Sequence, residues 1–242
     1  MAPCRAGCGS PTPPRQRRAL RSTYAGWNPR TYGRYGRHQW RAALPGTRVV
    51  VKDPFAMLSA PTIVAVTGAR PIQVYRHPGA VLASYRRMGW RPDLDEIADL
   101  VPVAADHRPE LAALWATGAE AMSEAARMAL FWAVLQQLVL DDLPRAPGTV
   151  LVPHADLAGG GLPAVRALFA ELGLEPTDDT ARVMSGGDRP APTSGSELHR
   201  LDRRPEEVAE SWRRHLEPAE VAEIEELAGP VLAELDAGRL VW

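Results

Sequence analysis

The chain has 242 residues and a mass of 26.3 kDa, which is enough for one large domain or two small ones. Apolar residues make up 45% and charged residues 24%, ordinary values that exclude a collagen-like or wholly disordered protein. No apolar run approaches the roughly 20 residues of a membrane span, and no secretory signal is visible. Two cysteines, Cys4 and Cys8, cannot form a disulfide scaffold, so the expected compartment is the cytoplasm.

Basic residues are distributed unevenly under a net charge of −1. The first 52 residues hold ten arginines and Lys52 but no Asp or Glu. We interpret residues 1–47 as an Arg-rich, largely irregular leader and residues 48–242 as one domain. A basic arm of this kind could also touch nucleic acid, although nothing else in it favours that partner. Lys52 is the only lysine in the chain, and an ammonium differs chemically from a guanidinium.

Three short segments predict the strands of a parallel sheet. Arg48–Lys52 is a β-branched run that predicts a buried strand ending at Lys52 and Asp53. Pro71–Arg76 predicts a second strand, and Gly148–Val152 a third. Helices are expected over 55–66, 78–88, 93–100, 109–140, 162–172, 206–215 and 218–235. Strands that alternate with helices indicate an α/β protein, with a three-layer parallel sheet flanked by helices.

Charged residues follow two of these strands. In open α/β sheets, ligands bind beyond the carboxyl ends of the strands, so Lys52 and Arg76 would face one crevice if their strands are neighbours. Arg76 precedes a helix that Pro78 is well placed to begin, and this combination predicts an anion site. Ser84 lies eight residues later, about two turns into that helix, and its hydroxyl could reach the same anion.

These segments, VVVKDPFAMLSAP and RPIQVYRHPGAVLASYRRMGW, resemble the sulfotransferases that use 3′-phosphoadenosine 5′-phosphosulfate (PAPS), in particular bacterial members with a Lys-Asp-Pro sequence. In that family a strand ends in a lysine beside the sulfuryl group. A later strand–turn–helix carries an arginine and, eight positions on, a serine, which both bind the 3′-phosphate. Three later segments, VLVPHADLAGG, ELGLEP and SWRRHLEPAEVAEIEEL, resemble family segments in the same order, so the resemblance covers residues 48–235.

The resemblance implies a P-loop-like architecture and transfer of a sulfuryl group from PAPS, as co-substrate, to a hydroxyl or amine of a small-molecule acceptor. Lys52 would neutralise charge on the donor, and Asp53 would accept the acceptor's proton. Arg76 and Ser84 would hold the 3′-phosphate. A further cation there is expected from a loop arginine: Arg200, Arg203 or Arg204. No metal and no membrane partner is expected.

The chain departs from the family in two places. The Gly-rich loop that cradles the 5′-phosphosulfate is not found, and Gly7–Ser10 is its nearest relic. The histidine base of the cytosolic branch is replaced by Pro54, which leaves Asp53 as the nearby base or, equally, as a helix cap. Two alternatives therefore stay open: an inactive nucleotide-binding remnant of the family and an Arg-rich nucleic-acid-binding protein.

Overall fold

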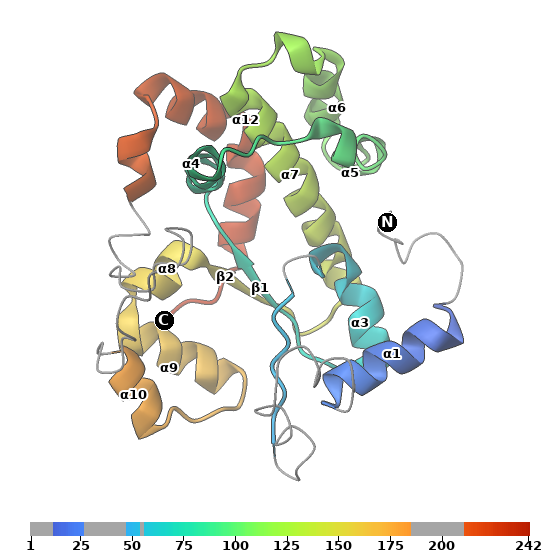
Figure 1. Cartoon of the computed structure of the whole chain (residues 1–242), viewed down its shortest axis with the longest axis vertical. Helices are drawn as coiled ribbons and strands as arrows, with labels where there is room; N and C mark the ends of the chain where they lie inside the picture. Colours follow the sequence, from blue (N-terminus) through green and yellow to red (C-terminus); the bar gives the residue numbers. More distant parts are fainter. Residues whose placement is uncertain (1–11, 27–46, 54–55, 185–210) are drawn as a thin grey trace. The chain divides into compact units, whose positions relative to one another are not determined.

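The computed structural model describes residues 12–26, 47–53, 56–184 and 211–242 (Figure 1). The described part is an α/β protein that is mostly helical and has a small parallel sheet of two strands. The chain divides into two compact units. Unit 1 takes residues from Met1–Pro71 and Val139–Thr149, and unit 2 takes residues from Ile72–Leu138 and Val150–Trp242.

The regular structure described in unit 1 is helical. Helix α1 (Pro14–Tyr24) contacts α3 (Ala60–Thr67), and the Arg21 Nε donates a hydrogen bond of 3.2 Å to the Val66 carbonyl. The 3₁₀ turns η2 (Met57–Ser59) and η5 (Leu143–Arg145) complete it. The expectation of an irregular leader is wrong for Pro14–Tyr24. Pro14 begins this helix, because proline is well tolerated at the first helical position, and no glycine or further proline interrupts it.

The prediction of a buried strand over Arg48–Lys52 is wrong. The segment forms neither strand nor helix, and the Val50 side chain is 83% exposed. A β-branched run favours a strand only where a neighbouring strand supplies hydrogen bonds and packing. Within the described residues, the strands that pair are β1 and β2, both in unit 2.

The sheet of unit 2 confirms the two other predicted strands. Strand β1 (Ile72–Tyr75) pairs in parallel with β2 (Val150–Pro153). The register sets Ile72 opposite Val150, Val74 opposite Val152 and Tyr75 opposite Pro153. At the other edge of β2, the Leu240 N–H donates a hydrogen bond of 2.9 Å to the Leu151 carbonyl.

Helices lie against both faces of β2. Val150 and Val152 pack with Leu168 of α9 (Gly161–Glu171). The opposite face of the sheet meets α12 (Pro218–Ala237), where the Tyr75 hydroxyl donates a hydrogen bond of 2.6 Å to Asp236. The same face reaches α7 (Glu124–Asp142) through Gln73, whose side-chain amide donates to Gln136. The two strands are thus held in place by contacts with α7, α9 and α12.

The remaining helices of unit 2 differ from prediction mainly at their bounds. The helix expected over 109–140 is divided, because Gly118 has a φ of +81° between α6 (Pro109–Ala116) and α7. Helix α4 (Pro78–Met88) ends before Gly89, as predicted. The described part of the 206–215 helix is the 3₁₀ turn η7 (Ser211–His215). The others are η3 (Leu94–Ile97), α5 (Val101–Ala105), η4 (Ala119–Ala121), α8 (His154–Gly159) and α10 (Asp178–Met184).

One guanidinium joins three helices of unit 2. Arg86 of α4 donates to Glu124 of α7 at 2.8 Å and to Glu220 of α12 at 2.5 Å. Glu220 also accepts the Glu217 N–H at 2.9 Å in the capping box that begins α12. Hydrogen bonding to Arg86 lowers the pKa of Glu220. Helix α4, which follows β1, is therefore fixed near its C-terminal end.

Among the described residues, no helix combines the length and apolarity that a membrane crossing requires.

Candidate functional site

The carboxyl end of β1 holds a guanidinium that the protein leaves incompletely paired. Arg76 follows Tyr75 directly, and its backbone carbonyl accepts a hydrogen bond of 2.9 Å from the indole of buried Trp132 in α7. Its side-chain Nε is buried and has no hydrogen-bond partner among the described residues. Burial lowers the pKa of Arg76, and the nearby charge of Arg87 lowers it further. A buried donor without a partner is costly, and Arg76 as a residue is only half-buried, so the guanidinium that carries this atom is suited to meet a ligand.

Arg76 lines a hollow of about 140 Å³ within unit 2. The hollow lies beyond the carboxyl ends of both strands, where ligands of parallel α/β sheets bind. The residues around it come from β1, α4, β2, α8, η7, α12 and the C-terminal segment: Tyr75, Arg76, His77, Ala80, Pro153, His154, Ala155, Asp156, Trp212, Arg213, Leu232, Asp236 and Arg239.

The two acids of the hollow already have cationic and hydroxyl partners. Arg239 lies 3.6 Å from Asp156 and 3.9 Å from Asp236, and Asp236 also accepts the Tyr75 hydroxyl. Burial and the bond to Asp236 raise the pKa of Tyr75 well above its usual range. Arg76, in contrast, makes no ion pair within the part of the chain that the structure describes. The electrostatics therefore favour an anion beside Arg76 rather than beside Arg239.

The N-terminus of α4 contributes less than the sequence suggested. The His77 Nδ1 accepts the Gly79 N–H at 3.1 Å, and the His77 carbonyl accepts the N–H groups of Ala80 and Val81. Pro78 has no N–H to offer. The first backbone donors of this helix are thus occupied within the protein, so its direct contribution to an anion is confined to side chains and the helix dipole.

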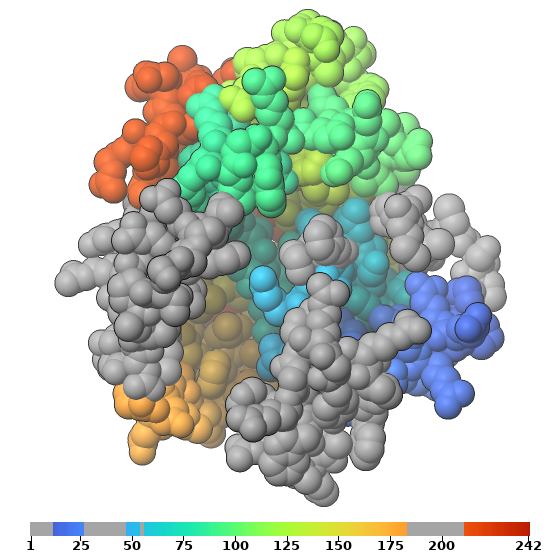
Figure 2. Space-filling model, in the orientation of Figure 1, coloured from blue at the N-terminus to red at the C-terminus, as the bar shows by residue number. Residues whose placement is uncertain are grey.

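Trp212 forms one wall of the hollow and leaves room only for glycine at position 79, near the start of α4. Its ring stacks on His77 at a centroid distance of 4.4 Å and an interplanar angle of 19°, and the Arg213 guanidinium lies 4.5 Å above it. A Cβ on Gly79 would overlap the indole, with the Trp212 Cε3 only 2.8 Å away. Figure 2 shows the atoms of α4 directly against those of η7 and the start of α12. Gly79 is therefore required by close packing.

His154 follows β2 as Arg76 follows β1, and both line the hollow. Its side chain is half-buried. Burial lowers the pKa of His154, and the charge of Arg76 lowers it further. The structure therefore places His154 among the polar groups of the candidate site.

Ser84 lies one turn of α4 beyond the hollow. Ala80 lines the hollow, and residues four and seven positions later, Ser84 and Arg87, follow on the same face of the helix. Four residues advance about 6 Å along a helix axis, so Ser84 is at the rim rather than in the wall. The structure thus brings Arg76 and the Ser84 face of α4 to one region.

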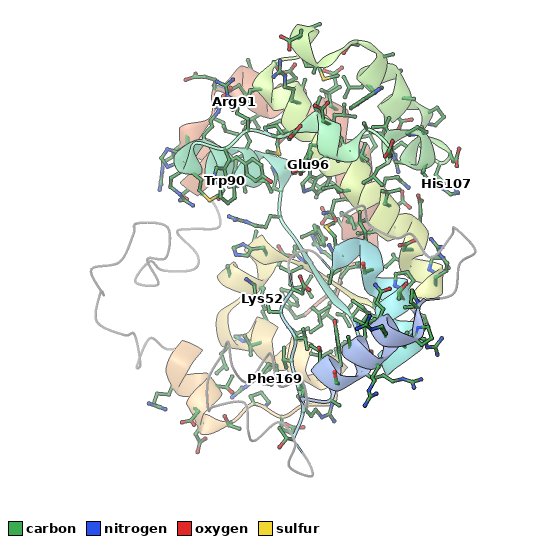
Figure 3. All side chains as sticks on the ribbon, turned by 45° about the vertical axis from the view of Figure 1, so that its right-hand side comes forward. Lys52, Trp90, Arg91, Glu96, His107 and Phe169 are labelled. Carbon is green, nitrogen blue, oxygen red and sulfur yellow. The ribbon has the colours of Figure 1, made fainter. Side chains whose placement is uncertain are left out.

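The two predicted catalytic residues lie in unit 1. Lys52 and Asp53 are exposed on a segment without regular structure, and Figure 3 shows the Lys52 side chain on it. The N-cap of η2 is Ala56, so Asp53 does not provide that cap. Three loop arginines were expected to add a cation: Arg200, Arg203 and Arg204. They lie outside the described residues, and so does the segment Gly7–Ser10.

Several residues of the hollow could not be found from the sequence. Asp236 and Arg239 lie more than 150 residues after β1, inside and beyond an ordinary amphipathic helix, and no local motif marks them. The signal for His154 was present, because a polar residue directly follows a buried apolar strand. Among the described residues, no three His, Cys, Asp or Glu side chains gather as they would around a metal ion.

No family model matches this chain, and neither a curated protein nor a solved structure matches it.

Proposed function

We propose that the chain is a PAPS-dependent sulfotransferase and that the hollow at the carboxyl ends of β1 and β2 receives the 3′-phosphate of the donor. The observation that carries this proposal is the Arg76 guanidinium in the wall of this hollow, with a buried Nε that has no hydrogen-bond partner among the described residues. The order of sequence segments that resemble the sulfotransferase family supplies the identity of the anion.

In this proposal each residue has a separate role. Arg76 binds the 3′-phosphate through charge-assisted hydrogen bonds, and Ser84 adds a hydroxyl from the same side of α4. Lys52 neutralises negative charge that develops on the leaving phosphate, and Asp53 accepts the proton of the acceptor hydroxyl or amine. The acceptor atom bonds to sulfur while the bond from sulfur to the bridging oxygen breaks. Adenosine 3′,5′-bisphosphate then leaves with that electron pair.

The proposal includes finer expectations. It includes the three-layer, P-loop-like architecture of the family, which is supported by the helices on both faces of β2. It also includes a cytoplasmic location, where PAPS is the co-substrate and a small molecule is the acceptor. A loop arginine among 200, 203 and 204 would provide the additional cation.

A second candidate is a nucleotide-binding member of the same family that does not turn over. The observation in its favour is the position of Lys52 and Asp53 on an exposed segment without regular structure. This candidate keeps the Arg76 half of the site and loses the chemistry. Transfer of labelled sulfate from PAPS to a panel of hydroxyl and amine acceptors distinguishes the two, because only the enzyme labels an acceptor.

Binding of adenosine 3′,5′-bisphosphate tests the half of the proposal that both candidates share. Calorimetric titration of the full chain should show one site. Arg76→Ala should weaken it by about 10- to 100-fold, because a charge-assisted hydrogen bond contributes about 1.5–3 kcal/mol. The matched control is Arg91→Ala, an exposed arginine of unit 2 that does not line the hollow. Equal affinity in the Arg76 and Arg91 variants would overturn the phosphate assignment.

A further inference from the structure

The ends of two neighbouring parallel strands hold two nitrogen groups, of which the proposed function uses one. The register pairs Val74 with Val152 and Tyr75 with Pro153, and the next residues in that register are Arg76 and His154. Both line the hollow, and the charge of Arg76 acts on the imidazole of His154. An anion that meets the Arg76 guanidinium in a hollow of about 140 Å³ therefore lies close to His154.

The other polar groups of the hollow are already engaged with one another. Asp156 and Asp236 face Arg239, and Tyr75 donates to Asp236. The His77 ring is held by its bond from Gly79 and its stack on Trp212. The titratable and charged groups that face His154 across the hollow are these: Tyr75, Arg76, His77, Asp156, Arg213, Asp236 and Arg239. His154 itself has no hydrogen bond to the described residues that would divert it from a ligand.

We infer that His154 is a second ligand of the anion beside Arg76 and that it takes up a proton when a dianion binds. The inference rests on the proposed function for the position of the phosphate. Its chemistry is shared by the dianions of phosphate monoesters and of inorganic sulfate, because each presents several acceptor oxygens and two negative charges.

The physical reason is a reversal of the electrostatic environment. In the free protein, burial and Arg76 disfavour the imidazolium form of His154. A bound dianion outweighs the charge of Arg76 and accepts a hydrogen bond from the protonated ring, so both effects change sign. The pKa of His154 is then higher in the complex than in the free protein. By linkage, affinity for the anion rises as pH falls between those two values and is constant above and below them.

Histidine signals in an NMR titration of the full chain test this directly. The chain has six histidines, and the loss of one ring signal in His154→Gln assigns it. Sodium sulfate is the probe, because sulfate keeps its charge between about pH 5 and pH 8, where histidine titrates. Sodium chloride at equal ionic strength controls for screening. We expect sulfate, but not chloride, to raise the pKa of His154 by about one unit, with about tenfold tighter binding at the acidic end.

Two test variants and one control variant keep the test decisive. His154→Gln should bind sulfate with little dependence on pH, whereas the control His107→Gln should behave as the wild type. His107 is exposed and does not line the hollow. Arg76→Ala should raise the pKa of His154 in the free protein and abolish its response to sulfate. Two results would overturn the inference: sulfate binding by His154→Gln that still depends on pH as in the wild type, or a pKa of His154 in the wild type that sulfate leaves unchanged.

The same titration with adenosine 3′,5′-bisphosphate separates this inference from the proposed function. If sulfate shifts His154 but the bisphosphate does not bind, the inference stands and the PAPS proposal falls. If the bisphosphate binds and leaves the pKa of His154 unchanged, the proposed donor stands and the role of His154 falls.

Discussion

The segments that end at Lys52 and at Arg76 look alike in the sequence and differ in the structure. Both are short apolar runs that finish at a cation and are followed by a proline. The second forms β1, because β2 pairs with it, Trp132 binds its last carbonyl and Asp236 accepts the hydroxyl of Tyr75. The first pairs with no strand among the described residues and stays without regular structure. Strand formation here depends on what the rest of the chain supplies, and not on the run itself.

The largest expected effect concerns the exposed cation of this pair. If the Lys52 segment supplies catalysis, Lys52→Ala should lower turnover of sulfuryl transfer by about 10²- to 10³-fold, as loss of one preorganised stabilising group does. Binding of adenosine 3′,5′-bisphosphate should change little, because Arg76 holds the phosphate. Steady-state rates and calorimetry on the same preparations measure the two effects. Unchanged turnover would leave the Lys52 segment without a function and confine the site to unit 2.

The start of α4 offers a test of what fixes the Arg76 end. Gly79→Ala should destabilise the protein by about 2 kcal/mol, within the usual cost of overpacking, because the new Cβ overlaps Trp212. Gly159→Ala is the control: Gly159 is the last residue of α8, no atom beyond its chain neighbours lies within 4 Å of a new Cβ, and stability should rise by less than about 1 kcal/mol. Chemical denaturation measures both free energies. If the two variants had equal stability, Trp212 would not restrict this position.

The valines of the two segments sharpen the comparison. Val152 of β2 is fully buried and Val50 is 83% exposed. Val152→Ala should cost about 1.5–2 kcal/mol for two lost methyl groups, and Val50→Ala should change stability by less than about 0.5 kcal/mol. Denaturant midpoints at constant m-value give both numbers. A large loss in Val50→Ala would show that the segment packs in solution after all.

The smallest expected effect concerns the hydroxyl that anchors β1 to α12. Tyr75→Phe should destabilise by about 1 kcal/mol, because Asp236 loses a hydrogen bond but keeps Arg239. The pKa of Tyr75 is raised in the folded protein, so the folded state favours the neutral phenol. Its contribution is complete below about pH 10, the ordinary pKa of tyrosine, and decreases as pH rises above that value.

Comparison of wild type and Tyr75→Phe by denaturation at neutral and alkaline pH measures this contribution. The difference in stability between them should shrink at alkaline pH. A constant difference would mean that the hydroxyl stabilises the fold in some way other than through its proton.

Local signals in the sequence predicted local structure well. Pro78 and Gly89 bracket α4 as expected, and both strands of the observed sheet were placed within two residues. Two local features were missed, the helix Pro14–Tyr24 and the break at Gly118. The prediction of a strand over 48–52 failed for a non-local reason. Arg48–Lys52 was predicted as a strand without a known neighbour. At the predicted anion site, the sequence did not show that His77 occupies the first N–H groups of α4. The Asp236–Arg239 side of the hollow depends on tertiary packing, which no spacing in the sequence encodes.

The ion pairs that join Arg86 of α4 to α7 and α12 have a consequence for ligand binding. Arg86 comes two residues after Ser84 and shares its helix with Ala80 at the hollow. Because the helix is already immobilised by these ion pairs and by Trp212, a guest that docks there need not restrain a mobile wall, and little ordering entropy opposes its arrival. Preorganisation of this kind favours a small rigid guest, whose own freedom is then the main quantity lost in the complex.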